Sequence, residues 1–331
     1  MLIQLQKILI TFNMIQDEIF PQIGETINQY EFESLLAETS ESTKIYSAYS
    51  PILKFQVIIK VISLEEADLH YADTEAVILT EINSPYVLNA IDVFDINYKK
   101  NTSLKSNLLR FIVTPKIGDQ DAYTYSKKSE NVKFIIYDTL KALQYLHGMN
   151  IIHRDVKPEN IFIRSIDDKK GSYFSDDSDT ELDLNMSVNS FLNNFSSPRP
   201  IRAVLGDLGL AKQYPKNQEM YETQEFVGTL QYCSPQIAAN VPYNESTDIW
   251  SLGATAYYLI YDQYPFKHSD SDPMVDIKSI VHCDYSFPSN DDVPLEAKDL
   301  ISRMLQFSQK DRISVEDALH HVWFKDITED W

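Results

Sequence analysis

The spacing of hydrophobic and polar positions changes about a third of the way along the chain. Before that point, runs rich in β-branched and aromatic residues lie between polar stretches, at residues 30–36, 45–49, 55–62, 87–94 and 108–113. Such runs are typical of strands, and the polar residues 97–107 are expected to form a loop between the last two. Residues 74–82 instead have helical spacing and end before Asn83-Ser84-Pro85, which predicts one helix among the strands.

After about residue 117 the apolar residues recur at helical spacing. Within residues 132–147, one predicted helix face carries Ile136, Leu140, Leu143 and Leu146, and Gly148 is expected to cap the C-terminus of that helix. Similar spacing predicts helices at residues 246–261, 295–305 and 315–321. Strands followed by helices predict an α+β protein with two lobes, a small and mostly antiparallel β lobe followed by a larger, mostly helical lobe.

Residues 165–200 interrupt this pattern. They contain seven acidic against three basic residues and many Ser and Asn residues. This composition predicts a largely disordered acidic insertion at the surface. Apolar residues within it fall at helical spacing, so a short docking helix is the alternative to a flexible loop: Leu184, Val188, Phe191, Leu192 and Phe195.

Composition narrows the class of protein. With 331 residues, of which 44% are hydrophobic, the chain can bury a large core. Its net charge of −20 argues against nucleic acid as a partner and favours a basic protein or peptide surface, although acidity also aids solubility. The two cysteines, Cys233 and Cys283, fit a reducing compartment rather than a disulfide framework, so a cytoplasmic location is expected.

The sequence favours neither a membrane span nor a signal peptide. No apolar run is long enough to cross a bilayer. Residues 1–15 are rich in Leu and Ile but carry Gln4, Gln6 and Lys7, and they lack a basic start and a small-residue cleavage site. A packed first strand or helix is therefore expected there.

Residues 153–160 (His-Arg-Asp-Val-Lys-Pro-Glu-Asn) carry the strongest chemical signal. Asp155 is expected to accept the proton of an attacking hydroxyl, and Lys157 to steady a transferred phosphoryl group. Asn160, five positions after Asp155, is expected to hold a metal ion. This set suits phosphoryl transfer from a metal-bound nucleotide, whereas the alternative is a polar loop that follows a helix.

Two further charged positions extend this interpretation. Asp207 follows the strand-like residues 203–205 and precedes Gly209 by two positions, where a carboxylate can reach a metal ion. Lys60 is the one charge in the strand pattern at residues 57–61, and a buried lysine is costly unless it is paired. Glu75 is the expected partner, and a paired Lys60 can bind nucleotide phosphates. The alternative is an exposed Lys60 and Glu75 without mutual contact.

Over residues 30–325 these motifs, in this order, resemble the eukaryotic protein kinase family of the serine/threonine type. The resemblance implies a two-lobed fold that holds ATP and Mg²⁺ between its lobes. It divides the chain into an extension (1–29), an N-lobe (30–114), a hinge (115–117) and a C-lobe (118–325). Residues 262–266, 284–288 and 297–301 most resemble the calcium/calmodulin-dependent kinase group.

The resemblance implies roles for single residues. Lys60 and Glu75 correspond to the strand lysine and its helix partner, and Asp155 to the catalytic base. Asn160 and Asp207 correspond to the metal ligands, and Lys157 and Thr229 to residues that support catalysis. The nucleotide site is implied to include Ile45, Ile58, the gatekeeper Thr114, the hinge residues Lys116 and Ile117, and Asp121 at the ribose. The residues that correspond to structural supports are Asp248, which braces the catalytic loop, Arg312 and Trp323-Phe324.

The chain departs from the family pattern at the phosphate loop and at the adenine pocket. Glu38, Ser40 and Thr43 stand where the family has glycines, so close backbone approach to phosphate is harder and Glu38 adds like charge. Ile58 replaces a small Ala and narrows the adenine pocket, and Leu208 replaces Phe with another apolar side chain. Weak ATP affinity or slow turnover is expected, not loss of chemistry.

Another departure concerns Arg312. Gln236 stands where the family has a glutamate, so it can offer Arg312 only a neutral hydrogen bond. Arg312 is therefore expected to be underpaired, at a cost of roughly 1–3 kcal/mol if it is buried.

The activation segment suggests how activity is controlled. Glu225 lies three residues before Gly228, where a phosphorylated residue often lies in the family. It is predicted to substitute for that phosphate and pair with Arg154, so that basal activity needs no upstream kinase. Thr223 and Tyr221 are the alternative phosphorylation sites.

The expected function is transfer of the γ-phosphate of ATP to Ser/Thr hydroxyls of protein substrates. Glu159 and Asp121 are acids where relatives read a substrate arginine, which predicts a basic preference. The sequence ends seven residues after Phe324 without a calmodulin-binding tail, so direct calmodulin control is not supported. The alternative is a pseudokinase scaffold, which the missing glycines and Ile58 favour and the complete set of catalytic residues opposes.

Overall fold

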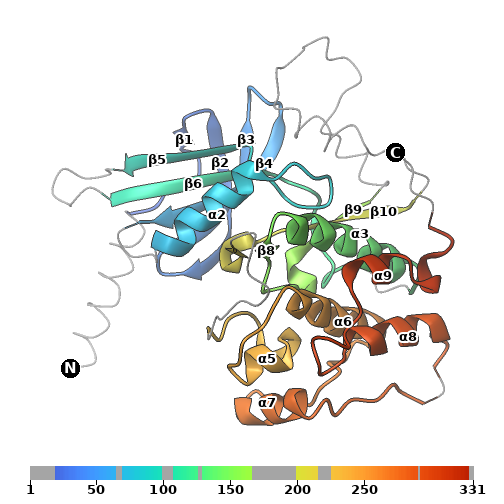
Figure 1. Cartoon of the computed structure of the whole chain (residues 1–331). Coiled ribbons are helices and arrows are strands. Elements are labelled where there is room, and N and C mark those ends of the chain that lie inside the picture. The colour runs from blue at the N-terminus through green and yellow to red at the C-terminus, as the bar shows by residue number, and fades with distance from the viewer. Residues whose placement is uncertain are drawn as a thin grey trace. The chain divides into compact units, whose positions relative to one another are not determined.

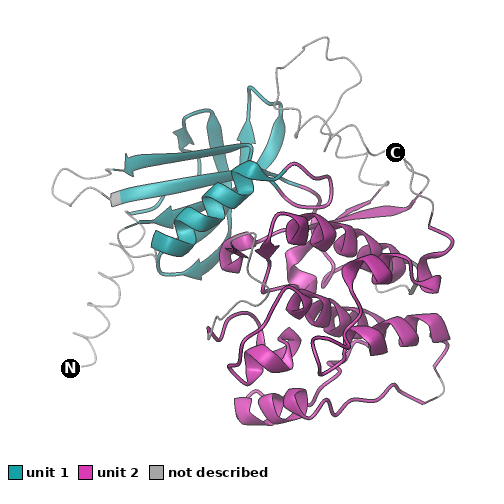
Figure 2. Ribbon diagram, in the orientation of Figure 1, with its two compact units in different colours: residues 1–82, 89–116, 171–189 teal, residues 83–88, 117–170, 190–331 magenta. Residues whose placement is uncertain are grey.

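The computed structural model describes residues 19–64, 69–98, 107–125, 129–165, 199–214, 225–289 and 291–327. They form two compact units (Figure 2). Unit 1 comprises the described parts of residues 1–82 and 89–116, and unit 2 those of residues 83–88, 117–170 and 190–331. The predicted hinge residues Pro115 and Lys116 belong to unit 1, and Ile117 to unit 2.

Unit 1 is built on a six-stranded antiparallel sheet, beside which the helix α2 (Leu69–Glu81) lies (Figure 1). In spatial order the strands are β1 (Thr26–Ile27), β2 (Tyr30–Ser40), β3 (Thr43–Ser50), β4 (Phe55–Ser63), β6 (Asn107–Pro115) and β5 (Asp92–Tyr98). This arrangement confirms the predicted small β lobe with one helix. Because β1 pairs with the start of β2, part of the predicted N-terminal extension belongs to the sheet.

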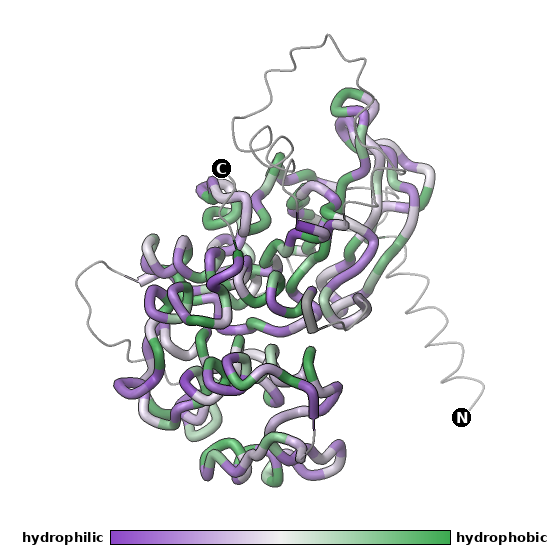
Figure 3. The backbone as a smooth tube through the Cα atoms, turned by 90° about the vertical axis from the view of Figure 1, so that its right-hand side faces the viewer, coloured by the Kyte–Doolittle hydropathy of each residue, from purple (hydrophilic) through white to green (hydrophobic). Residues whose placement is uncertain are grey.

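The core of unit 1 follows from the alternation of burial along its strands, and both hydrophobic and hydrophilic residues occur along the backbone (Figure 3). In β4, Val57, Ile59 and Val61 are fully buried, whereas the residues between them are only partly buried. Phe94 and Phe111 stack across β5 and β6 with ring centroids 4.9 Å apart. The β-branched and aromatic content of these runs thus produces one buried sheet face.

Two predicted elements of unit 1 had wrong bounds. The helix predicted at residues 74–82 begins at Leu69, because its first five residues bury only Ala72 and so show no apolar periodicity. The strand predicted at residues 87–94 is β5, which begins only at Asp92 and extends into the predicted loop. Val87 instead forms an isolated parallel bridge with Leu205, a long-range contact that local spacing does not report.

Unit 2 is mostly helical, as predicted. Its helices are α3 (Ser129–Gly148), α5 (Pro235–Ala238), α6 (Ser246–Tyr261), α7 (Pro273–Val281), α8 (Leu295–Met304) and α9 (Val315–Leu319). Its short strands are β7 (Gln120–Asp121), β8 (Ile151–Ile152), β9 (Ile161–Ser165), β10 (Ile201–Leu205) and β11 (Lys212–Gln213). Single turns of 3₁₀-helix occur at η1 (Pro158–Asn160), η3 (Leu208–Leu210), η4 (Leu230–Tyr232) and η5 (Val322–Phe324).

The helix α3 packs against β10, α6 and α9, and α6 packs against α8. The predicted apolar face of α3 is confirmed, since its members are all fully buried: Ile136, Leu140, Leu143 and Leu146. The predicted cap at Gly148 is wrong. Gly148 is the last helical residue, and the left-handed backbone that ends the turn belongs to Asn150, with φ 59°.

Both ends of the predicted insertion, residues 165–200, have partners in the fold. Ser165 of β9 pairs with Ile201 of β10, and the buried Arg199 donates from Nη1 to Asp138 Oδ1 of α3 at 2.9 Å. This buried ion pair holds residue 199 in the fold, although local composition predicted disorder. The predicted docking helix at residues 184–195 and the predicted packed start at residues 1–15 lie outside the described residues. In the part of the chain that the structure describes, no helix is both long and apolar enough to span a bilayer.

His268 lies between two carboxylates, in the loop that connects α6 to α7. Its Nδ1 is 2.6 Å from Asp276 Oδ1 and its Nε2 is 3.0 Å from Asp270 Oδ1, with Gln231 and the Tyr264 ring also against it. The hydrogen bond with Asp276, more than any other contact, raises the pKa of His268 above its ordinary value of 6.5.

This pairing predicts a pH-dependent stability. Because the pKa of His268 is higher in the folded state, its contribution is complete below pH 6.5 and is lost as the pH rises through the folded value. We expect His268→Gln to lower the free energy of unfolding more at about pH 6 than at about pH 9, as measured by urea unfolding. An equal loss at both pH values would contradict a charged His268.

Candidate functional site

The start of the segment 153–160 is hydrogen-bonded to Asp248 of α6. Its Oδ2 accepts the backbone N–H of His153 and its Oδ1 that of Arg154, both at 2.9 Å. Burial alone would raise the pKa of Asp248, but the hydrogen bond from His147 Nε2 at 2.9 Å and the two N–H groups hold it below its ordinary value. Arg154 has a left-handed backbone with φ 68°, a strained conformation that these bonds compensate. The predicted bracing contact of Asp248 is confirmed.

The imidazole of His153 connects this segment to the turn that contains Asp207, a role that the sequence alone had not indicated. Its Nδ1 accepts the backbone N–H of Asp155 at 3.2 Å, so the ring proton lies on Nε2, which donates to the Gly206 carbonyl at 2.9 Å. His153 is fully buried. Its position two residues before Asp155 was the only signal in the sequence.

Asp155 is the centre of a closed hydrogen-bond network. Its Oδ1 accepts the Thr229 N–H at 2.9 Å and the Thr229 hydroxyl at 2.8 Å. Its Oδ2 lies 2.8 Å from Lys157 Nζ and accepts Asn160 Nδ2 at 3.0 Å, and Lys157 also donates to Thr229 Oγ1 at 2.8 Å. The four residues predicted to carry catalysis therefore meet in one place.

Gly228 allows this approach of Thr229. Its φ is +88°, and a Cβ at this position would lie 2.4 Å from the Arg154 carbonyl oxygen. Only glycine fits a left-handed backbone this close to another chain segment. The Gly228-Thr229 pair thus delivers both Thr229 donors to Asp155.

Asn160 and Asp207 offer oxygen donors of the kind that Mg²⁺ prefers. Asn160 Nδ2 donates two hydrogen bonds to Asp155, one to the backbone oxygen at 2.8 Å and one to the carboxylate. Because the amide nitrogen is used in this way, the Asn160 Oδ1 is left as the ligand oxygen. Asp207 is exposed, has φ 53°, and accepts the Gly209 N–H at 3.4 Å. Leu208 beside it is fully buried, as expected for an apolar replacement of Phe.

The donor set fits a magnesium ion completed by phosphate oxygens. No group of three or more His, Cys, Asp or Glu residues that could hold a metal occurs among the described residues. Two protein oxygens together with substrate phosphates match the usual coordination of Mg²⁺.

In unit 1, Lys60 and Glu75 form the predicted pair. Lys60 Nζ lies 2.8 Å from both carboxylate oxygens of Glu75, whose side chain is 5% exposed. This pairing compensates for the burial of the carboxylate. The helix that carries Glu75 is also tied to the sheet by Arg110, which binds Asp73 of α2 and, at 2.8 Å and 2.9 Å, Asp95 of β5. The sequence analysis did not identify Arg110, because its partners are distant in the chain.

The other predicted nucleotide residues of unit 1 lie on neighbouring strands. Ile45 is opposite Lys60, and Ile58 is opposite Thr114. The buried Thr114 donates from Oγ1 to the Ile58 carbonyl at 3.4 Å. Lys116 Nζ lies 3.3 Å from Gln56 Oε1. The register thus groups Ile45, Lys60, Ile58 and Thr114 on three adjacent strands.

In unit 2, Ile117 packs against the buried Leu88 and Val204. The Asp121 carboxylate is already engaged, because its Oδ1 accepts both the N–H and the hydroxyl of Thr124 at 2.7 Å. The predicted contact of Asp121 with a ribose stays a prediction. The other carboxylate oxygen, Oδ2, would make that contact.

The hairpin that replaces the glycine-rich loop is short. Ser40 pairs with Thr43, so only Glu41 and Ser42 connect β2 to β3, and β2 has three register irregularities. Glu38 forms an ion pair with Lys44 at 2.9 Å. The like charge expected from Glu38 is therefore partly offset by its neighbour on β3.

The predicted pairing of Glu225 with Arg154 is confirmed. Glu225 Oε2 accepts Arg154 Nη1 at 2.9 Å, and Lys212 Nζ lies 3.7 Å from the other carboxylate oxygen. The Arg154 side chain is 1% exposed, and its Nε donates to the Leu210 carbonyl at 2.7 Å. The alternative sites Thr223 and Tyr221 lie outside the described residues.

Arg312 forms the predicted neutral bond, Nη2 to Gln236 Oε1 at 3.0 Å. The expectation that it is underpaired is wrong. It also donates to the carbonyls of Ser246 at 2.8 Å and Gln306 at 3.0 Å, and its guanidinium lies over the Trp250 ring at 5.2 Å. Burial nevertheless lowers the pKa of Arg312 to about 10, because the acceptors are neutral.

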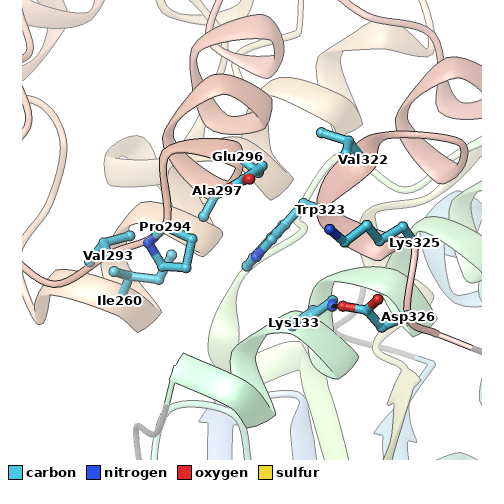
Figure 4. A pocket seen from close by; sticks show the side chains of 10 residues that line it. All are labelled: Lys133, Ile260, Val293, Pro294, Glu296, Ala297, Val322, Trp323, Lys325 and Asp326. Carbon is cyan, nitrogen blue, oxygen red and sulfur yellow. Dashed lines mark hydrogen bonds and ion pairs between the residues drawn. The ribbon is translucent and has the colours of Figure 1, made fainter.

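A separate cavity of about 280 Å³ lies in unit 2 among α3, α6, α8 and η5 (Figure 4). Trp323 forms one wall, and Lys133 pairs with Asp326 at 3.5 Å across it. None of the residues predicted for catalysis line this cavity. Its lining residues are Lys133, Ile260, Val293, Pro294, Glu296, Ala297, Val322, Trp323, Lys325 and Asp326.

Comparison with known proteins gives one family. The family described as the protein kinase domain matches residues 40–324. Myosin light chain kinase A of Dictyostelium discoideum is 27% identical over 306 residues, 89% of this chain and 88% of that protein. A probable myosin light chain kinase of the same organism is 27% identical over 305 residues, 91% of this chain but 54% of that protein. Testis-specific serine/threonine-protein kinase 1 of Mus musculus is 28% identical over 290 residues, 85% of this chain and 68% of that protein.

Proposed function

Because the chain belongs to the protein kinase family and its relatives are serine/threonine kinases, we propose that it is an active enzyme, which transfers the γ-phosphate of ATP to Ser/Thr hydroxyls of proteins. The observation that carries this proposal is the closed network around Asp155. A scaffold has no chemical need for a carboxylate that binds Lys157, Asn160 and Thr229 together.

In the proposed mechanism the residues of unit 2 position and deprotonate the acceptor. Thr229 and Asn160 fix the Asp155 carboxylate, which accepts the proton of the attacking hydroxyl. Lys157 bears a positive charge 2.8 Å from that carboxylate and stabilises the negative charge of the transferred phosphoryl group. Positioning and electrostatics supply most of the catalysis in phosphoryl transfer.

Members of this family use ATP and Mg²⁺, and the residues of this chain suit both. Asn160 Oδ1 and the Asp207 carboxylate would hold Mg²⁺, which neutralises phosphate charge when bound. Lys60, charged and held by Glu75 at 2.8 Å, would bind phosphate oxygens, with Ile45, Ile58, Thr114, Lys116, Ile117 and Asp121 assigned to the nucleotide by resemblance. The exposed Glu159 and the chain's net charge of −20 support a preference for basic substrates. Two free thiols, Cys233 and Cys283, support a reducing location, the cytoplasm.

A pseudokinase scaffold is the second candidate, and the β2–β3 hairpin favours it. The turn lacks glycine, and Ile58 reduces the space opposite Thr114. Both features weaken nucleotide binding without touching Asp155. The two candidates therefore differ in whether transfer occurs at all.

The test is transfer of labelled γ-phosphate from Mg²⁺-ATP to a basic Ser/Thr peptide, with Asp155→Asn as the control. Transfer by the wild type and its loss in the variant would support the enzyme. If neither protein transfers phosphate while both unfold cooperatively in a thermal melt, the scaffold is favoured, and nucleotide binding should then be measured by calorimetry.

Glu225 is proposed to keep the enzyme active without phosphorylation. Replacing it by Ala leaves the buried Arg154 guanidinium without its carboxylate, although Leu210 and Tyr243 still accept from it. We expect Glu225→Ala to lower kcat/KM of phosphatase-treated enzyme roughly tenfold, equivalent to about 1.4 kcal/mol of transition-state stabilisation.

Glu222→Ala is the matched control, because it removes an acid of the same segment three positions away. It should leave kcat/KM nearly unchanged. If Glu225→Ala has no more effect than Glu222→Ala, then Glu225 does not substitute for a phosphate.

A further inference from the structure

The cavity in unit 2 between α3, α6, α8 and η5 has no role in the proposed chemistry (Figure 4). The Trp323 ring lies on one side of it, and Pro294 and Ala297 lie on the other. Val322 belongs to its lining and is nevertheless 50% exposed, so the cavity continues into an apolar surface. An apolar cavity of roughly 150 Å³ accommodates a benzene ring. With a volume of about 280 Å³, this cavity has room for about two such rings.

The charged residues that line the cavity balance one another. Lys133 of α3 pairs with Asp326 at 3.5 Å. The other two charged lining residues, Lys325 and Glu296, have opposite signs. A mouth without net charge does not attract an acidic or a basic segment in particular. The lining therefore favours a ligand that is apolar and uncharged.

The insertion between β9 and β10 contains a stretch of this character. Its seven acidic residues all lie within residues 167–183, whereas residues 184–198 carry no charged side chain. Transfer of apolar side chains from water into an apolar cavity is favourable. The apolar residues of the uncharged stretch fall at helical spacing: Leu184, Val188, Phe191, Leu192 and Phe195.

The end of the insertion is fixed close to the cavity. Arg199 binds Asp138 of α3 at 2.9 Å, and its guanidinium lies 5.5 Å from the centre of the Tyr137 ring. The Tyr137 ring lies 5.3 Å from the Phe324 ring, which lies 5.2 Å from the Trp323 ring. Only two aromatic rings therefore separate Arg199 from the Trp323 wall of the cavity.

The chain before Arg199 is long enough to reach the cavity. Phe195 is four residues before Arg199 and Phe191 is eight residues before it. At about 3.5 Å per residue, an extended chain reaches about 14 Å and about 28 Å over these lengths. A tethered segment also has an effective concentration in the millimolar range, so a weak intrinsic affinity is enough to fill the cavity.

We propose that the cavity binds residues 191–195 of this same chain, with the rings of Phe191 and Phe195 packed against Trp323. Residues four positions apart share one face of a helical turn, so both rings can enter together. Two aromatic rings match the volume of the cavity, and aromatic rings pack favourably against an indole. The proposal does not depend on the proposed kinase function.

Docking of the insertion would fix one end of the β9–β10 hairpin. The opposite end of this hairpin adjoins the proposed metal ligands, since Asn160 directly precedes β9 and Asp207 follows β10 by two residues. The alternative occupants of the cavity are residues 191–195 of a second copy of the chain and a peptide of another protein. The experiments below distinguish both from docking within one chain.

The first experiment places a photo-cross-linker in the full chain, with p-benzoylphenylalanine in place of Phe191, and maps the cross-links by mass spectrometry. We expect cross-links within one chain to residues 293–297 and 322–326. The same probe in place of Phe174 is the matched control, because Phe174 lies in the acidic part of the insertion. It should give at least tenfold fewer cross-links to these residues.

Two results of this experiment would overturn the proposal. One is an equal yield of cavity cross-links from positions 191 and 174. The other is a mixture of ¹⁴N-labelled and ¹⁵N-labelled chains in which the cross-links join light to heavy chains, since the occupant would then belong to a second copy.

The second experiment measures binding of a fluorescent peptide of residues 184–198 to the full chain by anisotropy. Phe191→Asp with Phe195→Asp removes the chain's own docking residues. We expect the peptide to bind this double variant at least tenfold more tightly than the wild type, whose own segment competes with it. Adding Val322→Glu should weaken binding at least tenfold. Val241→Glu is the matched control, because Val241 is 43% exposed and does not line the cavity, and it should leave binding unchanged.

No binding to the double variant at millimolar peptide would exclude the cavity as the site for this segment. Equal affinity for the double variant and the wild type would mean that the chain does not fill its own cavity. That result would overturn the proposal in favour of a segment from another molecule.

Discussion

Replacing Asp155 by Asn is expected to lower kcat for phosphoryl transfer by roughly 10²–10⁴-fold, the range that a general base contributes. The variant retains the size of the side chain but not its basicity. It also changes the network, because four donors from Thr229, Lys157 and Asn160 converge on the two carboxylate oxygens. The amide of Asn has only one acceptor oxygen, so one set of donors then faces an N–H₂ group. We therefore expect a loss of about 1–2 kcal/mol in the free energy of unfolding as well.

The two effects of Asp155→Asn are separated by measuring kcat in single-turnover experiments and stability by urea unfolding. Thr229→Val is the informative companion, because it removes the hydroxyl donor yet keeps the shape and the Asp155 carboxylate. It should reduce kcat less than Asp155→Asn does. Activity of Asp155→Asn within a few-fold of the wild type would exclude Asp155 as the base.

Replacing Arg312 by Met is expected to lower the free energy of unfolding by about 3 kcal/mol. Arg312 is 5% exposed, and removal of its guanidinium leaves Gln236 Oε1 and the carbonyls of Ser246 and Gln306 without this donor. The contact with the Trp250 ring is lost as well. Among the described residues Arg312 has no carboxylate partner, so its replacement by Met leaves no buried negative charge without a counter-charge. This limits the loss of unfolding free energy.

Urea unfolding measures this change, and Arg303→Met provides the matched control. Arg303 is 58% exposed and pairs with Asp299 on the surface of α8, so its replacement should change stability by less than about 0.5 kcal/mol. Equal effects of the two replacements would mean that the hydrogen bonds of Arg312 contribute nothing beyond a surface ion pair.

Elements with clear local periodicity were predictable from the sequence. The helix α6 has the predicted bounds, Ser246–Tyr261, and the buried face of α3 was identified correctly because four apolar residues repeat every three or four positions. Prediction was less accurate where a buried polar residue interrupts the pattern. The start of α2 was misplaced because residues 69–73 bury only Ala72. Arg199 was assigned to a disordered insertion because the partner that buries it, Asp138, is 61 residues away.

The sequence by itself identified the residues that are proposed to carry the chemistry. Asp155, Lys157 and Asn160 lie within six positions, and their spacing is a property of the chain alone. The cost of a lone buried charge also predicted the pair of Lys60 with Glu75. The pair of Arg154 with Glu225 was predicted from the family resemblance, which places a phosphorylated residue at that position.

Only the tertiary structure decided how these groups are supported. The acceptors of Arg312 are largely backbone carbonyls, and the proton of His153 is assigned by a backbone N–H and the Gly206 carbonyl. Because nearly every residue carries the same backbone N–H and C=O groups, the sequence does not indicate which of them accept or donate these hydrogen bonds. The ring contacts among Tyr123, Tyr258 and Tyr264 likewise depend on the fold, because these residues come from separate segments of the chain. Residue types therefore indicate which side chains can take part in the chemistry. The hydrogen-bond partners of those side chains depend on which segments pack against one another.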